Sequence, residues 1–280
     1  MESFQTTDGH LLREHATIIR QLVLQSLTEA GSGHLGASLG LADVFTALYF
    51  SVLRHDPAKP QWPERDRLVL SIGHAAPVLY ATLAHAGYFK TEELQSLRKL
   101  GSRLQGHPGR DHGLPGLELS AGSLGQGLSV AIGMALAARF DGLNHTVFVV
   151  MGDGELQEGS VWEAAMAASH HHLDNLVAIV DRNGVQIDGP TEKVMHLEPL
   201  ADKWKSFGWN VAECDGHNRE QLIETLKHRR NATQPLVVLA HTIMGKGIPA
   251  IEGDYRWHGK VPSREQLPGF LKDLRNMHKT

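Results

Sequence analysis

Residues 151–189 read MGDGELQEGSVWEAAMAASHHHLDNLVAIVDRNGVQIDG. The run that leads into this segment, residues 146–151, is apolar and rich in β-branched side chains, which is typical of a buried strand. A helical pattern follows over residues 158–171, and a second apolar run over residues 176–180 predicts another strand. A strand, a helix and a strand in this order predict a crossover unit whose two strands are parallel neighbours.

Polar residues stand directly after each of these two strands. Gly152-Asp153-Gly154 follows the first strand and Asn183 follows the second, with residues 155–182 between the two motifs. Open α/β sheets bind ligands at the carboxyl ends of their strands, so we expect both motifs at one edge. A carboxylate and an amide oxygen suit Mg²⁺, although Gly-Asp-Gly alone is more often an ordinary turn. The spacing, the intervening helix and the asparagine together favour a metal site.

The rest of the chain continues the alternation of strands and helices. Predicted strands cover residues 66–71, 146–151, 176–180, 210–215 and 235–242. Predicted helices cover residues 10–29, 38–52, 91–99, 158–171, 200–207 and 219–230, with one beginning near residue 74, one ending near 139 and a polar helical tail over 262–280. The pattern predicts an α/β fold with a doubly wound, mostly parallel sheet flanked by helices, as a single domain over residues 1–280 with a short polar C-terminal tail.

Composition limits the class of protein. The chain has 280 residues, 41% apolar and 21% charged, which is typical of a soluble globular protein. The net charge of −4, without a basic cluster, argues against a nucleic-acid partner, and no apolar run is long enough for a membrane span. A single cysteine, Cys214, and the absence of a signal-peptide pattern predict a cytoplasmic protein.

Four histidines stand in loops that we expect at the same sheet edge as Asp153 and Asn183. They are His34, His74, His107 and His258. Each one alone is more often a surface residue than a ligand-binding one. Zinc is the alternative explanation for clustered histidines, but it requires closely spaced histidines or additional cysteines, which the sequence lacks.

The motifs together resemble those of a known family. Gly-Asp-Gly followed about thirty residues later by Asn resembles the thiamin diphosphate motif. GDGELQEGSVWEA (152–164) and GSLGQG (122–127) are similar to segments of transketolases and favour them over deoxyxylulose-phosphate synthases. The resemblance runs from about residue 10 to residue 265 and includes at least six motifs in order. It covers only the amino-terminal, diphosphate-binding third of the family's full-length members.

The resemblance implies thiamin diphosphate and Mg²⁺ as cofactors, with Ca²⁺ or Mn²⁺ as substitutes. The implied metal ligands are the side chains of Asp153 and Asn183 and the carbonyl of Val185. Leu124 and Ile187 are implied to pack on the cofactor, and His74 and His258 to reach its phosphates. The full set of implied cofactor-binding residues is His74, Gly122, Leu124, Gly152, Gly154, Glu155, Asn183, Ile187 and His258.

The implied reaction is transfer of a two-carbon ketol unit from a ketose, usually a phosphate, to an aldose by thiamin diphosphate carbanion chemistry. The implied catalytic residues are His34, His107, His258 and Glu158. The histidines would bind sugar hydroxyls and move protons, for which an imidazole with a pKa near neutral is suited. Glu158 matches the family residue that meets its counterpart across the subunit interface. The implied partner is a separate C-terminal subunit that carries the pyrimidine-binding domain and its glutamate, in a heterotetramer of two such pairs. Which ketose and which aldose react stays open.

Three alternatives remain at this level. The chain could be a non-catalytic or regulatory thiamin diphosphate-binding subunit, or a subunit of a related enzyme such as a deoxyxylulose-phosphate-synthase-like ligase. It could also be a Mg²⁺-dependent phosphate-ester enzyme, although such enzymes usually place several carboxylates around the metal. One departure from the family is His241, which stands where a lysine is usual and leaves the role of that lysine open.

Overall fold

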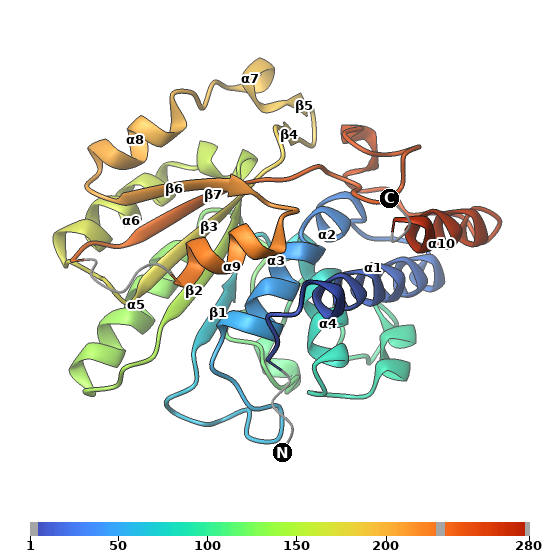
Figure 1. The fold of residues 1–280 in the computed structure, drawn as a ribbon, viewed down its shortest axis with the longest axis horizontal. Helices are drawn as coiled ribbons and strands as arrows, with labels where there is room; N and C mark the ends of the chain where they lie inside the picture. The colour runs from blue at the N-terminus through green and yellow to red at the C-terminus, as the bar shows by residue number, and fades with distance from the viewer. Residues whose placement is uncertain (1–4, 228–232, 278–280) are drawn as a thin grey trace.

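A five-stranded parallel sheet forms the middle of the computed structural model, which describes residues 5–227 and 233–277 (Figure 1). The strands run in the order β1-β2-β3-β7-β6, and all neighbouring pairs are parallel. They are β1 (Arg67–Leu70), β2 (Val147–Gly152), β3 (Leu176–Arg182), β6 (Asn210–Asp215) and β7 (Leu236–His241). The predicted strands and the predicted doubly wound, mostly parallel α/β sheet are confirmed.

Helices on one face of the sheet pack into a large apolar core (Figure 1). Phe148 and Val150 of β2 point into this core. The helices are α1 (Gly9–Ala30), α2 (Gly36–Gly40), α3 (Ala42–Ala47), α4 (Ala76–His85), α9 (Arg219–Lys227) and α10 (Leu267–Asn276). Within the described ranges, no helix is both long and apolar enough to cross a membrane.

Helices on the other face enclose a second core, into which Val147, Val149 and Met151 of β2 point. They are α5 (Gly127–Phe140), α6 (Gly159–His170) and α8 (Leu200–Ser206). Because both faces are covered, successive residues of β2 alternate between two apolar cores. This explains why the strand reads as a continuous apolar run rather than as an alternating one.

The sequence determines where α1 begins and ends and which of its faces is buried. The Asp8 carboxylate caps α1 by accepting hydrogen bonds from the backbone of His10 and Leu11. Gly31 ends it with a φ of 66°, a conformation that favours glycine. Between the two caps, the buried positions recur at helical spacing and include Leu12, Ala16, Ile19, Val23 and Leu27.

Several predicted helices differ from the observed ones. The predicted helix over 38–52 is divided into α2, α3 and a π-helical turn (Leu48–Val52). A Cβ on Gly40 would lie 3.0 Å from the carbonyl oxygen of Ile243, so the helix here packs directly against distant backbone. The predicted helix over 91–99 is a 3₁₀ turn (Thr91–Ser96). The predicted helices over 219–230 and 262–280 extend beyond the described residues.

The segment after β3, predicted as a loop, contains short secondary structure. β4 (Val185–Gln186) and β5 (Gly189–Pro190) form a small antiparallel hairpin, and α7 (Thr191–Val194) follows it. Two-residue strands are too short to give a periodic pattern, which is why the sequence does not reveal them. Further 3₁₀ turns lie at Gly73–Ala75, Arg110–His112, Gly154–Gln157 and Tyr255–Trp257.

Trp162 of α6 packs in a cluster with Trp204 and Trp209. The ring centroids of Trp162 and Trp204 are 5.2 Å apart, and those of Trp204 and Trp209 are 4.9 Å apart. Trp162 also donates a hydrogen bond of 2.8 Å from its indole nitrogen to the carbonyl of Leu156. The aromatic cluster therefore connects the second core to the loop that follows the Gly-Asp-Gly motif.

Candidate active site

A cavity of about 260 Å³ opens at the carboxyl end of the sheet. The parallel register places Gly152 beside Asp181, so the turn after β2 and the turn after β3 are neighbours, as the sequence predicts. Most of the predicted site residues line this cavity: His74, Leu124, Gly152, Asp153, Gly154, Glu155, Glu158, Asn183, Val185, Ile187 and His258. Gly122 instead lines another cavity, of about 270 Å³.

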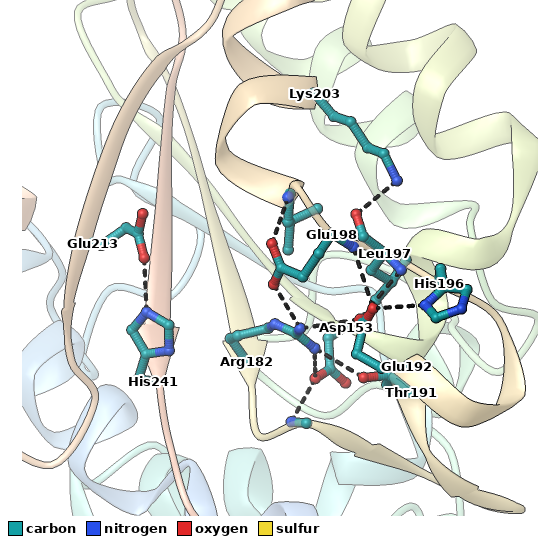
Figure 2. Close-up of polar contacts among 12 residues, drawn as sticks. Asp153, Arg182, Thr191, Glu192, His196, Leu197, Glu198, Lys203, Glu213 and His241 are labelled. Carbon is teal, nitrogen blue, oxygen red and sulfur yellow. Dashed lines mark hydrogen bonds and ion pairs between the residues drawn. The ribbon is translucent and has the colours of Figure 1, made fainter.

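Asp153 is 1% exposed, and both of its carboxylate oxygens accept hydrogen bonds. Oδ1 accepts from the backbone of Gly154 at 2.8 Å, and Oδ2 accepts from the backbone of Gly184 at 2.7 Å. Oδ2 also accepts from Arg182 Nη1 at 3.0 Å (Figure 2). Burial raises the pKa of Asp153, while the donors and the Arg182 charge oppose that rise. The carboxylate is therefore held in one orientation.

Asn183 is oriented by a second buried carboxylate. Its Nδ2 donates to Asp181 Oδ2 at 2.8 Å, and its Oδ1 accepts from the backbone of Val185 at 3.0 Å. Asp181 is 1% exposed and also accepts a hydrogen bond from the hydroxyl of Thr242. Burial raises the pKa of Asp181 to about 7, and the nearby charge of Asp153 adds to the rise.

Glu155 joins three loops around the cavity. Its Oε1 accepts from the hydroxyl of Ser71 and, at 2.8 Å, from the backbone of Gly125. Its Oε2 accepts from the backbone of Gly152 at 3.2 Å. The side chain is 2% exposed, and burial raises its pKa. Glu155 therefore fixes the ends of β1 and β2 and the loop before α5 relative to one another.

The four histidines converge on this edge from loops far apart in the chain. Ring centroids of His34 lie 5.3 Å from His74, 6.0 Å from His107 and 5.5 Å from His258. His74 and His258 are 4.9 Å apart. Nδ1 of His34 is buried and has no hydrogen-bond partner in the described part of the chain. A polar atom in this state is what a bound ligand could satisfy.

All four histidines have a pKa below the ordinary value, which favours the uncharged form and departs from the near-neutral pKa expected from the sequence. Burial lowers the pKa of His34 to about 4 and that of His74 to about 3, and the neighbouring His258 adds to both shifts. Burial also lowers the pKa of His107 and His258. Neutral imidazoles have both a donor and an acceptor nitrogen, so the cluster can bind hydroxyl groups and exchange protons with them.

Leu124, Glu158 and Ile187 line the cavity with partly or largely exposed side chains, whereas His241 is not among the lining residues. Ile187, at the tip of the β4–β5 hairpin, is 64% exposed, and Leu124 is half-buried. Glu158 precedes α6 and is exposed. His241, at the end of β7, pairs with Glu213 of β6 at 2.9 Å, and both side chains are about half exposed. An apolar rim beside a polar cavity is the arrangement expected where a ligand or partner covers the site.

The donor set fits a hard divalent cation. Asp153, Asn183 and Val185 all line the same cavity, and between them they offer one carboxylate, one amide and one backbone carbonyl. Within residues 5–227 and 233–277, no group of three or more His, Cys, Asp or Glu side chains is arranged to hold a metal. The predicted magnesium ligands would not form such a group, because only one of them belongs to these residue types.

Sequence reasoning missed several residues that shape the site. Asp181 and Arg182 directly precede Asn183 in the sequence, but the sequence does not reveal which groups their side chains contact. Ser71 ends the first strand and could have been proposed from that place alone. Arg98 has a φ of 61°, and its charge helps lower the pKa of His34 and His107. Its position against these histidines depends on loop folding that no periodicity predicts.

Comparison with known proteins defines the class to which this fold and cavity belong. Residues 12–268 match the family model for the transketolase, thiamine diphosphate binding domain. The chain is 34% identical to transketolase from Campylobacter jejuni, whose crystal structure superposes with a TM-score of 0.89 over 95% of this chain and 43% of that one. The chain therefore belongs to the transketolase family, in its thiamin diphosphate-binding part.

Relatives of the same length are separate subunits. The chain is 44% identical to the 6-deoxy-6-sulfo-D-fructose transketolase subunit of Clostridium sp. (strain MSTE9), over 94% of this chain and 96% of that subunit. It is also 44% identical to an apulose-4-phosphate transketolase subunit of Phocaeicola vulgatus, over 91% of this chain and 90% of that one. By contrast, it spans only 44% of human transketolase. The prediction of an amino-terminal transketolase subunit is confirmed, and these relatives do not support the alternatives.

Proposed function

We propose that the cavity at the end of β2 and β3 holds thiamin diphosphate through a divalent metal ion, with Mg²⁺ as the ion of choice. Asp153, Asn183 and the Val185 carbonyl would hold the metal. The observation that carries this proposal is that these three residues line one cavity at the edge of the sheet where the four histidine rings gather. When bound, thiamin diphosphate supplies the carbanion chemistry that ketol transfer requires.

The histidines divide between cofactor and sugar. His74 and His258 line the cavity together with Asp153 and would contact the diphosphate, whose negative charge a donor N–H stabilises. His34 and His107 are neighbours outside the lining of that cavity and would bind hydroxyls of the ketose. Their neutral state lets each accept a proton from one hydroxyl and donate a proton to another.

The rim residues would pack on the remaining parts of the cofactor and partner. Leu124 and Ile187 would contact the rings of the cofactor, and Gly122, Gly152 and Gly154 would let the backbone approach the cofactor closely. A Cβ on Gly154 would lie 2.8 Å from the Cβ of Gln186, so only glycine fits there. Glu155 would hold the surrounding loops, and the exposed Glu158 would face the partner subunit.

The partner would be a separate subunit that carries the pyrimidine-binding domain and its glutamate, in an assembly of two such pairs. The substrates would be ketoses and aldoses that bear an anionic group. This rests on relatives named for a sugar phosphate and for a sulfo-sugar, each 44% identical to this chain.

Thermal shift tests the proposal. Thiamin diphosphate with Mg²⁺ should raise the melting temperature of the chain mixed with its partner, and EDTA should abolish that rise. A sugar phosphate alone should have little effect. A rise with the sugar phosphate alone, and none with thiamin diphosphate and Mg²⁺, would instead support a phosphate-ester enzyme.

A further inference from the structure

Arg182 occupies an unusual place beside the proposed metal site. It is the residue between Asp181 and Asn183, at the end of β3, and its side chain is only 10% exposed. One guanidinium nitrogen, Nη1, donates to Asp153 at 3.0 Å and to the hydroxyl of Thr191 at 2.9 Å. Asp153 precedes α6, whereas Thr191 follows the β4–β5 hairpin. One nitrogen atom thus connects the two segments that border the cavity.

The other nitrogen, Nη2, is held by two carboxylates on the segment after the hairpin. It donates to Glu198 at 2.8 Å and to Glu192 at 3.3 Å. These carboxylates also accept from backbone amides of their own segment: Glu192 from Leu197 at 3.2 Å and Glu198 from Leu200 at 2.7 Å. Arg182 is therefore held through both nitrogens by a network that includes residues 191–200 (Figure 2).

The hairpin that this network anchors carries two proposed site residues. Val185 lies at its start and Ile187 at its tip, and the backbone of Thr191 bonds to the carbonyl of Gly184 at 3.0 Å to close its base. A shift of Thr191 would therefore move the Val185 carbonyl relative to Asp153. Arg182 contacts Asp153 and Thr191 directly, so it can set the separation of two proposed metal ligands.

We propose that Arg182 is a positioning residue: it clamps the β4–β5 hairpin against Asp153 and thereby prepares the site for a divalent metal ion. This inference rests on the function proposed above. Groups that hydrogen-bond to metal ligands orient those ligands, and losing such a group commonly reduces metal affinity by roughly 10- to 100-fold. Arginine suits the role because its planar fork presents several donors in fixed directions.

A competing effect of Arg182 is electrostatic repulsion of the metal. Its positive charge lies within hydrogen-bond distance of Asp153, and repulsion alone would make the metal bind more tightly once the arginine is removed. However, Glu192 and Glu198 contact the same guanidinium and offset its charge. We therefore expect positioning to outweigh repulsion, so that removing the side chain weakens metal binding.

The test compares Arg182→Met and Arg182→Lys with the wild-type chain, each mixed with the partner subunit. Calorimetry measures the Kd for Mg²⁺ at saturating thiamin diphosphate. Arg182→Met should raise the Kd about 10-fold or more, and Arg182→Lys should recover only part of the loss because lysine keeps the charge but not the fork. Arg139→Met is the matched control, since Arg139 lies near the C-terminal end of α5 and donates to Asp174 and to the carbonyls of His171 and His172. It should leave the Kd within about twofold of wild type.

Hydrogen exchange separates positioning from general destabilisation. In Arg182→Met without Mg²⁺, amides over 184–191 should exchange faster than in the wild type, and saturating Mg²⁺ should restore protection and most of kcat. A Kd within about twofold of wild type, or tighter binding in Arg182→Met, would overturn the proposal. If the wild-type chain itself fails to bind thiamin diphosphate and Mg²⁺, the proposed function is wrong instead.

Discussion

The two sides of the cavity differ in how their polar atoms are satisfied. On the carboxylate side, Asp153, Glu155 and Asn183 make hydrogen bonds with both of their side-chain polar ends. On the histidine side, the rings contact one another, and Nδ1 of His34 is buried with no hydrogen-bond partner among the residues that the structure describes. A buried polar atom without a partner costs roughly 1–3 kcal/mol.

This difference indicates how the site is completed. The carboxylate side is organised by the chain's own backbone amides and by Arg182, so its side chains are held in fixed directions before any ligand binds. The histidine side keeps unsatisfied hydrogen-bonding capacity, which a sugar, a cofactor or a partner would use. Changes on the first side should therefore affect cofactor binding, whereas changes at His34 and His107 on the second side should affect sugar turnover.

The largest expected effect comes from withholding the partner subunit. The chain alone, with thiamin diphosphate and Mg²⁺, should show no measurable ketol transfer, because the carboxylates of Asp153, Glu155 and Asp181 are already bound to other groups of this chain and the exposed Glu158 would face the partner. Adding the partner should restore turnover, which is measured by the release of the aldose product. Full ketol-transfer activity from the 280-residue chain by itself would contradict the two-subunit interpretation.

Asp153→Ala should remove the centre of the carboxylate side. We expect Mg²⁺-dependent affinity for thiamin diphosphate to fall at least about 100-fold, since a charged metal ligand and the partner of Arg182 are both lost. Calorimetry with the partner present measures this. Asp174→Ala is the control, because Asp174 is half exposed and pairs with Arg139. Unchanged affinity in Asp153→Ala would show that the metal site is assigned to the wrong residue.

His107→Ala should affect the histidine side alone. The KM for the ketose should rise about 10-fold, or kcat/KM fall by the same factor, while affinity for thiamin diphosphate stays within about twofold of wild type. His112→Ala serves as the control, because His112 is exposed and lies in the same loop region. Loss of cofactor affinity with normal sugar kinetics would mean that His107 belongs to the cofactor side.

Acidification should produce the smallest effect. The pKa of His34 is about 4 and that of His74 about 3, below the ordinary 6.5, so the unfolded chain binds protons that the folded chain does not. Stability from this source is present above pH 6.5 and decreases as the pH falls toward 4. Between about pH 7.5 and about pH 5 we expect these two histidines to lower the Tm by about 5 °C, whereas Asp181, whose pKa is raised to about 7, stabilises the fold as the pH falls and opposes this change. A His34→Gln/His74→Gln variant should show a smaller fall; an equal fall would exclude these histidines as the cause.

Periodicity and strand-end chemistry predicted a large part of this molecule. The five strands, the buried stripe of α1 and the adjacency of Asp153 and Asn183 all follow from local patterns and from the rule that parallel strands end at one edge. The convergence of the four histidines was predicted for the same reason, since each stands in a loop at that edge.

The parts that were missed depend on contacts between distant segments. The break between α2 and α3 accompanies the close approach of Ile243 to Gly40, two positions far apart in the sequence. The contacts of Arg182 with Glu192 and Glu198 depend on a loop whose path has no periodic pattern. Arg98 likewise reaches the histidines through a turn with a positive φ. Local sequence rules do not contain this information.

The hydrogen bond from Trp162 to Leu156 makes the protein's own fluorescence a probe of the cavity. Leu156 closely follows Asp153 in the chain, and the Trp162 ring is 5.2 Å from that of the fully buried Trp204. A shift of the loop when a ligand binds would change the polarity around the indole N–H and the excitation transfer within the tryptophan cluster. We therefore expect emission intensity and wavelength to change when the cofactor binds, without a label on either subunit.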